Sequence, residues 1–438
     1  MKRRVGLIAY DFPPLNSGGA QRPFQMVKSL VNEGFDLTVF TLNEECYNSS
    51  NLSFSLAEED LVGFNIVRSG LRKLSWIDKI HESYYFNLVD PIGDRWFINL
   101  LRAIESQNKV QKFDYLIFTC PPFSLAKIAL KVNKRLAIPY ILDFRDAWSQ
   151  WNIAPYASKL HYNMLLRLER KCINNAYLIA YTSVQQFQDL LKAHKLLPTK
   201  KFIYVPNGFK QYLDLPEYNS DDIVITYVGS FYFNPYTNNL SKKKWFQKKW
   251  YQLLQYNPRI EDWKYRSPYY FFKIVHEMLM IYPSLKNKLK LVFIGKKEFW
   301  FDEMVDEFGL KGIIEHNGFI EKKNVEHFLT KSDYLLLTSS KITNGRNYSV
   351  AGKTFEYISM KKPILGVVTE GEQKDLLEKS GIALLIDPDQ SVQSGILLGE
   401  VLSTNKGKYI LNKEYCDSFH YPNNFKMLIQ NLVCSKTV

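Results

Sequence analysis

The chain has 438 residues, of which 46% are hydrophobic and 23% are charged. This balance is ordinary for a globular protein with a substantial core, and it excludes a disordered, collagen-like or coiled-coil chain. Lys and Arg number 57 against 44 Asp and Glu, and the formal net charge of +13 favours an anionic partner: nucleic acid, a phosphorylated small molecule or an anionic membrane.

The first apolar run covers only Val5–Tyr10 before Asp11 and two prolines intervene, so it predicts a β-strand rather than a secretory leader. No run of about 18 uncharged apolar residues follows, which predicts no membrane span and a cytoplasmic location. The five cysteines include no Cys-x-x-Cys pair and the seven histidines show no ligand spacing. We therefore expect no metal site and no cofactor.

Short apolar runs alternate with segments of helical spacing in both halves of the chain. Helices are predicted between the runs, for example at Gln21–Asn32 and Leu125–Arg135. The alternation is typical of parallel sheets with helices on both faces, and it predicts an α/β fold of two doubly wound domains facing a cleft. The predicted strands are Val5–Tyr10, Asp36–Thr41, Tyr115–Thr119, Tyr140–Phe144, Leu178–Thr182, Ile223–Val228, Lys290–Ile294, Asp333–Thr338, Pro363–Val368 and Ala383–Ile386.

A turn-rich stretch from Val205 to Asp222 is read as a linker. We accordingly expect a first domain over 1–205, a second over 206–414 and a C-terminal helix over 415–438. Residues 231–267 break the alternation. They carry 8 basic residues, 2 acidic residues and 11 aromatic residues, so we interpret them as an insertion in the second domain.

Three segments offer candidate site residues at predicted strand ends. In the loop from Asp11 to Arg22, Gly18 and Gly19 would let the backbone approach a ligand at the start of a helix; a plain turn that needs two glycines is the alternative. Asp143, Arg145 and Asp146 follow a buried strand directly. They face a polar substrate or form a structural ion cluster.

The third segment, Asn344–Pro363, gives the strongest signal. Gly352 precedes a predicted helix, and Lys353 and Glu356 share one face of it. A lysine in the first helical turn opposes the helix dipole, and an anion would relieve that conflict. A nucleotide diphosphate would meet the helix amides and Lys353, with Arg346 nearby, while Glu356 would bind ribose hydroxyls; a surface Lys–Glu pair is the alternative. Further phosphate-binding candidates follow two strands of the same domain: Gly229, Ser230, Lys296 and Lys297. Solvated surface charges are the alternative for the two lysines.

Five short motifs follow one another along the chain, and their order and spacing are more informative than any one of them. They are Asp11-Phe-Pro-Pro with Gly18-Gly19, Asp143-Phe-Arg-Asp-Ala-Trp148, Val205-Pro-Asn-Gly-Phe209, Tyr227-Val-Gly-Ser230 and Gly352-Lys-Thr-Phe-Glu-Tyr357. Together they resemble the GT-B glycosyltransferases, specifically the family-4 group that transfers sugars with retention. The resemblance spans residues 5 to about 390.

The resemblance implies metal-independent transfer from a nucleotide-sugar donor, held by the second domain, to a glycan or lipid-linked acceptor on the first. It implies that Lys353 binds the diphosphate and Glu356 the ribose, that Gly18 and Gly19 lie near the donor, and that the 143–146 loop faces the reacting centre. It also implies a last helix that packs back on the first domain. Synthesis of a bacterial-type surface polysaccharide is the expected role.

The sequence departs from this pattern at three places. Tyr348 stands where many relatives have a glutamate eight positions before the ribose glutamate. The insertion follows Gly229 where relatives have a basic residue, for which Arg266 or Lys264 could substitute. The loop after the strand Tyr140–Phe144 lacks the histidine found in relatives. A GT-B-like protein that binds sugar nucleotides without transferring them therefore stays open.

The middle of the insertion, residues 241–256, predicts an amphipathic helix. Phe246, Trp250, Leu253 and Leu254 follow helical spacing and lysines flank them. The helix suits peripheral contact with an anionic inner membrane surface, or packs on the second domain with its lysines in solvent. The charge also prompts a nucleic-acid-binding hypothesis, but no recognisable module is present and the basic excess is concentrated in the insertion, so we expect no nucleic-acid partner.

Overall fold

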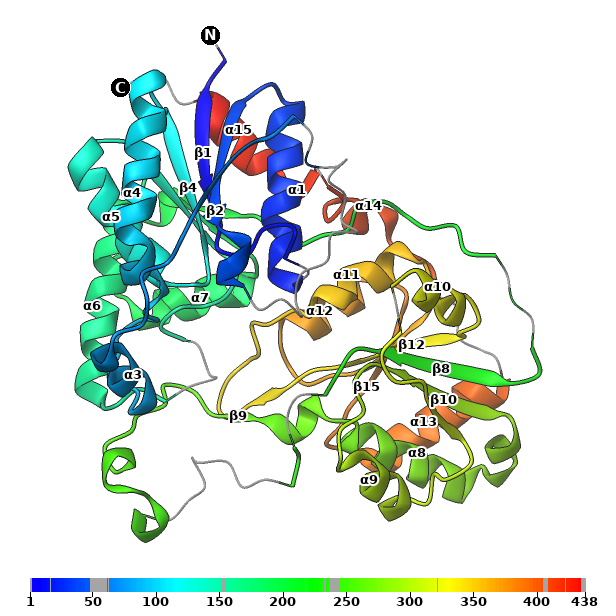
Figure 1. The fold of residues 1–438 in the computed structure, drawn as a ribbon. Helices are drawn as coiled ribbons and strands as arrows, with labels where there is room; N and C mark the ends of the chain where they lie inside the picture. Colours follow the sequence, from blue (N-terminus) through cyan, green and yellow to red (C-terminus); the bar gives the residue numbers. More distant parts are fainter. Residues whose placement is uncertain are drawn as a thin grey trace. The chain divides into compact units, whose positions relative to one another are not determined.

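The computed structural model describes residues 2–15, 17–47, 61, 63–150, 155–216, 218, 220–231, 234–236, 245–320, 322–404, 409–421 and 423–434. Two compact units divide the chain (Figure 1). Unit 1 comprises Met1–Asn207, Lys243–Arg259 and Tyr421–Val438, and unit 2 comprises Gly208–Lys242 and Ile260–His420. The middle of the insertion thus belongs to unit 1, whereas the sequence analysis placed the whole insertion in the second domain.

Unit 1 is built on a seven-stranded, wholly parallel sheet in the order β3-β2-β1-β4-β5-β6-β7. Its strands are β1 (Arg4–Ile8), β2 (Asp36–Leu42), β3 (Asn65–Ser69), β4 (Tyr115–Cys120), β5 (Tyr140–Phe144), β6 (Leu178–Tyr181) and β7 (Phe202–Tyr204). Its helices are α1 (Gly18–Asn32), α3 (Trp76–Ser83), α4 (Ile92–Val110), α5 (Ser124–Leu136), α6 (Lys159–Asn175), α7 (Val184–Ala193) and α15 (Lys426–Cys434).

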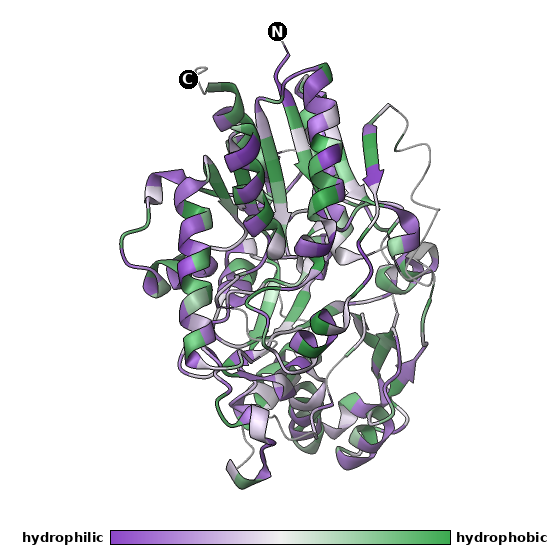
Figure 2. Ribbon diagram, turned by 60° about the vertical axis from the view of Figure 1, so that its left-hand side comes forward, coloured by the Kyte–Doolittle hydropathy of each residue, from purple (hydrophilic) through white to green (hydrophobic). Residues whose placement is uncertain are grey.

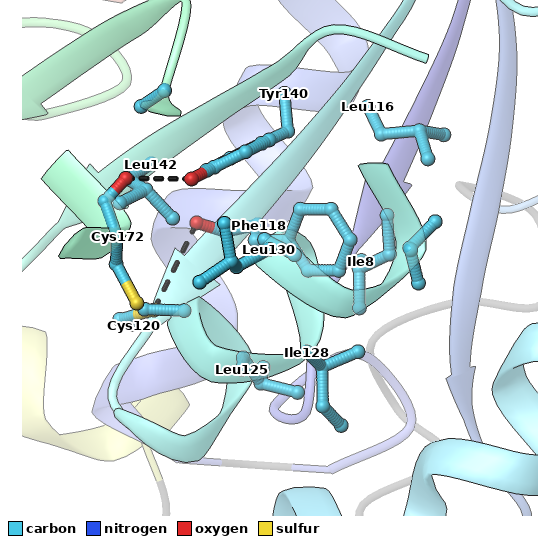
Figure 3. Packing of buried hydrophobic residues seen from close by; sticks show 14 of the residues in the cluster. Ile8, Leu116, Phe118, Cys120, Leu125, Ile128, Leu130, Tyr140, Leu142 and Cys172 are labelled. Atoms are coloured by element: carbon cyan, nitrogen blue, oxygen red, sulfur yellow. Dashed lines mark hydrogen bonds between the residues drawn. The ribbon is translucent and has the colours of Figure 1, made fainter. Parts of the chain in front are cut away.

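Helices cover both faces of the unit 1 sheet because successive strand residues point to opposite sides. On β4, Leu116 and Phe118 face the core under α4, α5 and α6, whereas Tyr115 and Ile117 face α1 and α15. Figure 3 shows the first of these cores, where the Tyr140 hydroxyl donates to the Cys172 carbonyl at 2.6 Å. Figure 2 shows the same division, with hydrophobic strands inside and helices that are hydrophilic on part of their surface.

The C-terminal helix α15 completes the second core of unit 1. Phe425, Leu428 and Leu432 are fully buried against β1 and α1. Each such side chain stabilises the fold by roughly 1.5–3 kcal/mol relative to exposure. Unit 1 therefore depends on residues that follow the whole of unit 2 in the sequence.

Unit 2 has a six-stranded parallel sheet in the order β11-β10-β8-β12-β14-β15, and β9 pairs with β13 in a separate antiparallel ribbon. The strands are β8 (Ile223–Val228), β9 (Glu261–Asp262), β10 (Leu289–Ile294), β11 (Ile314–His316), β12 (Tyr334–Thr338), β13 (Lys341–Ile342), β14 (Ile364–Val367) and β15 (Ala383–Ile386). The helices are α8 (Tyr269–Ile281), α9 (Phe301–Glu307), α10 (Lys322–Thr330), α11 (Gly352–Ser359), α12 (Glu372–Ser380), α13 (Ser391–Thr404) and α14 (Lys413–Asp417).

Every strand and example helix expected from the sequence is present within a few residues of its predicted bounds, and the two parallel α/β sheets confirm the predicted fold class. The prediction of an amphipathic helix in the insertion is wrong for residues 245–256, the part of it that the structure describes. Trp245–Gln247 and Trp250–Gln252 form two short 3-10 turns instead. The predicted residues 241–244 lie outside the described residues. None of the described helices has the length and apolar character needed to cross a membrane.

Candidate active site

The carboxyl edge of the unit 2 sheet holds the clearest site geometry. Helix α11 begins at Gly352 beside the end of β8, because the Tyr357 hydroxyl accepts a hydrogen bond from the Val228 amide at 3.1 Å. The N-cap residue of α11, Ala351, makes no side-chain capping bond, and the first turn contains no acidic residue. The positive end of the helix dipole is therefore left for an anion.

Lys353 turns inward from this helix start. Its ammonium donates to the Val228 carbonyl at 2.8 Å and lies 3.7 Å from the centroid of the Tyr227 ring. Burial lowers the pKa of Lys353 from 10.5 to about 7; nearby Glu356 opposes this shift, and Arg266 adds to it. Lys353 is thus a partly desolvated amine at a helix N-terminus, ready to gain a charge when an anion arrives.

Gly229 makes room for that amine. Its φ of +133° is a backbone conformation that favours glycine, and a Cβ there would lie 2.8 Å from the Lys353 Nζ. The next residue, Ser230, accepts a hydrogen bond from the Lys296 amide at 3.0 Å, which ties the loops after β8 and β10 together. The sequence singled out these residues from strand ends, and the structure brings Gly229 and Lys353 together.

Other predicted residues of unit 2 lie differently. The Glu356 side chain is exposed one turn beyond Lys353, and Gly352 is exposed as well. The Lys296 side chain is exposed and pairs with Glu298 at 3.0 Å. Arg346 forms a bidentate pair with Asp375 and a further pair with Glu370, which raise the pKa of its guanidinium. These pairs already satisfy much of the Arg346 charge.

Arg266 comes from the end of the insertion. It lies on a 3-10 turn, Trp263–Arg266, and pairs with Glu261 at 3.3 Å. Its charge is close enough to Lys353 to depress the pKa of that lysine. Lys264, the other candidate in the insertion, is held 3.4 Å from the centroid of the Tyr269 ring. Of the two, Arg266 is the one that acts electrostatically on the Lys353 site.

In unit 1 the candidate residues gather at the carboxyl edge of the other sheet. Arg145 donates to the Gly19 carbonyl at 2.6 Å and to Asp11 at 3.3 Å, and it also donates to the Pro121 carbonyl. Its own carbonyl accepts from the Thr182 hydroxyl at 2.7 Å. Arg145 therefore fastens the loops that follow β1, β4, β5 and β6 to one another.

Asp143 is fully buried, and both of its oxygens accept from Arg22 at 2.7–3.2 Å. The same guanidinium donates to the carbonyls of Val205 and Pro206 at 2.8 Å. Sequence analysis missed Arg22. Its signal was the i, i+4 spacing to Met26, which places a charged residue on the apolar face of α1. Asp146 is half-buried in the loop that follows.

Gly18 and Gly19 differ in what surrounds them. A Cβ on Gly18 would meet nothing within 4 Å, whereas a Cβ on Gly19 would lie 2.1 Å from the Asp11 Oδ2 and 2.8 Å from the Arg145 Nη1. Gly18→Ala should therefore leave the melting temperature unchanged, so that a loss of activity would report close approach of a ligand. Gly19→Ala should displace Asp11 and loosen Arg145, which thermal unfolding of the two variants side by side will distinguish. Equal destabilisation by both would contradict this assignment.

Among the described residues, no group of three or more His, Cys, Asp or Glu side chains converges to hold a metal ion.

Comparison with known proteins identifies the fold. No protein-family model matches the sequence, and no curated protein matches it. Sucrose-phosphate synthase from Thermosynechococcus elongatus superposes with a TM-score of 0.62 at 12% identity over 99% of this chain and 100% of that one.

Two more solved structures are similar. WaaG, a glycosyltransferase involved in lipopolysaccharide biosynthesis, has a TM-score of 0.54 at 12% identity over 97% of this chain and 96% of its own. UDP-GlcNAc 2-epimerase from Methanocaldococcus jannaschii has a TM-score of 0.51 at 10% identity over 99% and 100% of the two chains. The chain has two Rossmann-like domains, and its fold is that of the GT-B glycosyltransferases.

Proposed function

We propose that the protein is a glycosyltransferase that moves a sugar, with retention, from a nucleotide-diphosphate sugar to a glycan or lipid-linked acceptor in the synthesis of a bacterial-type surface polysaccharide. The observation that carries the proposal is the Lys353 site: a desolvated amine beside Gly229 at the uncapped start of α11. A diphosphate is the ligand that uses both the amine and the helix amides.

Unit 2 binds the donor in this proposal. The amides at Gly352 and the ammonium of Lys353 receive the diphosphate, and Arg266 supplies additional positive charge near Lys353. The Gly229–Ser230 turn lies beside the site and accepts a hydrogen bond from the Lys296 amide. Glu356, exposed one helical turn on, accepts hydrogen bonds from the ribose hydroxyls. Arg346 is left as a structural residue, because Asp375 and Glu370 hold its guanidinium.

The chemistry asked of these groups is electrostatic. Negative charge grows on the diphosphate as the bond to the sugar breaks, and a fixed cation in a partly dry site stabilises that charge without reorganising. The leaving phosphate oxygen takes the proton of the acceptor hydroxyl, so no strong protein base is required. In unit 1, Asp143 positions Arg22 and the linker, while Arg145 and Asp146 form the edge that faces the acceptor.

A thermal-shift panel of UDP-, GDP-, dTDP- and ADP-sugars, followed by a transfer assay with the best ligand, tests the proposal. A ligand that binds only the folded protein raises its melting temperature. Glu356→Ala should weaken donor binding at least tenfold, because a hydrogen bond to a charged group contributes roughly 1.5–3 kcal/mol. Glu378→Ala, an exposed glutamate on α12 of the same unit, is the matched control. No shift with any nucleotide sugar would refute a donor site.

A second candidate function is sugar-nucleotide binding without transfer to an acceptor. It is favoured by Tyr348, a buried tyrosine in the loop before α11 where a glutamate was expected from the family resemblance. A UDP-GlcNAc 2-epimerase with the same fold gives this candidate a concrete chemistry to examine. Product analysis separates the two: transfer gives a glycosylated acceptor and free nucleotide, whereas an epimerised or intact nucleotide sugar supports the alternative.

A further inference from the structure

Three segments of unit 1 that are far apart in sequence carry solvent-exposed apolar side chains. We call them the aromatic shelf. Its members are Leu74, Trp76, Ile77 and Ile80 in and before α3, Leu160 and Met164 at the start of α6, and Trp245, Phe246, Trp250, Leu253 and Leu254 in the insertion.

Ring contacts join the three segments. The His161 ring of α6 stacks on Phe86 with centroids 6.3 Å apart, and Phe86 stacks on Tyr84 at 5.8 Å. Tyr84, which follows α3, in turn contacts Trp250 at 5.9 Å and Tyr251 at 4.9 Å. Figure 1 shows α3 beside the start of α6. These contacts bring the end of α3, the start of α6 and the second turn of the insertion to one ring cluster, of which Trp250 is an exposed member.

The insertion is fixed to unit 1 at its other end as well. Tyr156 and Tyr256 exchange backbone hydrogen bonds of 2.9 and 3.0 Å, and Arg259 pairs with Asp189 at 2.7 Å where both side chains are nearly buried. The insertion is therefore held to unit 1 at Trp250, Tyr251, Tyr256 and Arg259, while Trp245 and Trp250 are largely exposed to solvent.

Helix α3 owes its shape to its ends rather than to burial. It contains no buried residue. Ser75 and Asp78 form a reciprocal capping box, with bonds of 3.1 and 2.8 Å, and Arg72 pairs with Asp78 at 3.0 Å. Trp76 is 71% exposed, Trp245 76% and Trp250 71%, and every tryptophan that the structure describes as exposed is in the shelf. Within the part of the chain that the structure describes, α3 buries none of its apolar side chains, which indicates a surface that something else covers.

The charge around the shelf identifies the occupant. Six basic residues, Arg72, Lys73, Lys79, Lys159, Lys248 and Lys249, lie on these segments against two acidic ones, Asp78 and Glu82. Two copies facing each other would bring like charges together, which opposes self-association. Tryptophan amid lysine is the composition of interfacial membrane segments, where rings enter the headgroup region and lysines meet anionic lipid.

We propose that the aromatic shelf docks unit 1 on the surface of an anionic lipid bilayer. The expected amphipathic helix of the insertion is replaced by a composite surface, in which α3 and α6 contribute as much as the insertion does. Docking requires no sugar nucleotide, so it stands or falls separately from the transferase proposal. It would bring unit 1 to the place where a lipid-linked acceptor is found.

Flotation of the full chain with phosphatidylcholine vesicles, with and without phosphatidylglycerol, tests the docking. The wild type should float with the anionic vesicles and lose binding as salt rises. The double variant Trp245→Ser/Trp250→Ser should bind at least about tenfold more weakly. Trp76→Ser, on a different segment, should also weaken binding. All three side chains are exposed, but Trp250 also contacts Tyr84, so circular dichroism and the melting temperature of each variant check that the fold is retained.

The matched control is Phe299→Ser/Phe319→Ser, which removes two exposed aromatic residues from unit 2. It should bind like the wild type. Lys73→Glu/Lys79→Glu should abolish the preference for phosphatidylglycerol. Failure of the wild type to float, or equal flotation of the wild type and both tryptophan variants, overturns the proposal. A wild-type dimer in sedimentation that the tryptophan variants dissociate, without vesicle binding, would assign the shelf to a second copy instead.

Discussion

Replacing Lys353 by methionine is expected to lower the turnover number about 10²- to 10³-fold, while the affinity for the donor nucleotide falls by less than about tenfold. Methionine keeps the length and packing of the side chain but removes the amine that lies against Val228 and Tyr227. Removal of a preorganised group that stabilises developing charge has an effect of this size on turnover. Steady-state kinetics and equilibrium titration with the nucleotide give the two numbers.

The control for this variant is Lys311→Met. Lys311 is exposed between α9 and β11 and pairs with Asp306 at 3.2 Å, so its replacement should change turnover by less than about threefold. A Lys353→Met enzyme with a normal turnover number and only a raised donor KM would contradict a role in the transition state.

The depressed pKa of Lys353 adds a pH dependence. Between pH 7 and 10.5 the unfolded chain holds a proton on this lysine that the ligand-free folded chain does not, so the contribution of Lys353 to stability rises with pH across that range. A bound diphosphate favours the charged form of Lys353, whereas the ligand-free folded chain favours the neutral form. At about pH 8, nucleotide binding should therefore take up part of a proton, measurable by calorimetry in two buffers of different ionisation enthalpy. Lys353→Met should abolish the uptake.

Truncation of Arg22 should destabilise unit 1 by about 3–5 kcal/mol. Arg22→Ala leaves the Asp143 carboxylate fully buried without its cation. It also removes the guanidinium donor from the carbonyls of Val205 and Pro206, although Asn424 still donates to the Pro206 carbonyl at 3.0 Å. Breaking a buried pair on one side costs this much because the remaining charge stays desolvated. Urea unfolding followed by tryptophan fluorescence measures the effect, since Trp96 and Trp148 are buried in unit 1.

Two comparisons make that measurement specific. Arg22→Met with Asp143→Leu removes both charges and should recover part of the loss. Lys361→Met breaks the exposed pair with Asp214 in unit 2 and should leave the urea midpoint essentially unchanged, because solvent screens such a pair. If the free energy of unfolding of Arg22→Ala lies within about 1 kcal/mol of the wild-type value, the Arg22–Asp143 pair does not stabilise unit 1. A direct contact between Asp143 and the substrate would then be the better interpretation.

The central strands were predictable because each is buried on both faces and reads as a continuous apolar run, as β4 and β12 do. The strands β3, β7 and β11 were missed. All three lie at sheet edges, where pairing on one side allows short and partly polar sequences such as Asn65–Ser69. In the two parallel sheets, the missed strands are therefore edge strands, whose sequences are short or partly polar.

Site prediction succeeded where local sequence determines local structure. Gly229 ends one strand and Lys353 starts one helix, so the topology of a parallel sheet brings them to the same edge. It failed for Arg22, whose partners are 121 to 184 residues away in sequence. The helical spacing in the insertion was too short to specify a helix, because a helix of that length needs a packed face and these residues are fixed to unit 1 through Tyr256 and Arg259 instead.

The return of the chain from unit 2 to unit 1 has a consequence for how the protein is made. Ribosomal synthesis lets the N-terminal part of a chain begin to fold first. Here the hydrophobic layer between β1, α1 and α15 lacks Phe425, Leu428 and Leu432 until all of unit 2 has been translated. Unit 1 is thus the first unit to leave the ribosome and the last to be completed. While unit 2 is being translated, the apolar surface of β1 and α1 that α15 will cover stays exposed and is accessible to chaperones.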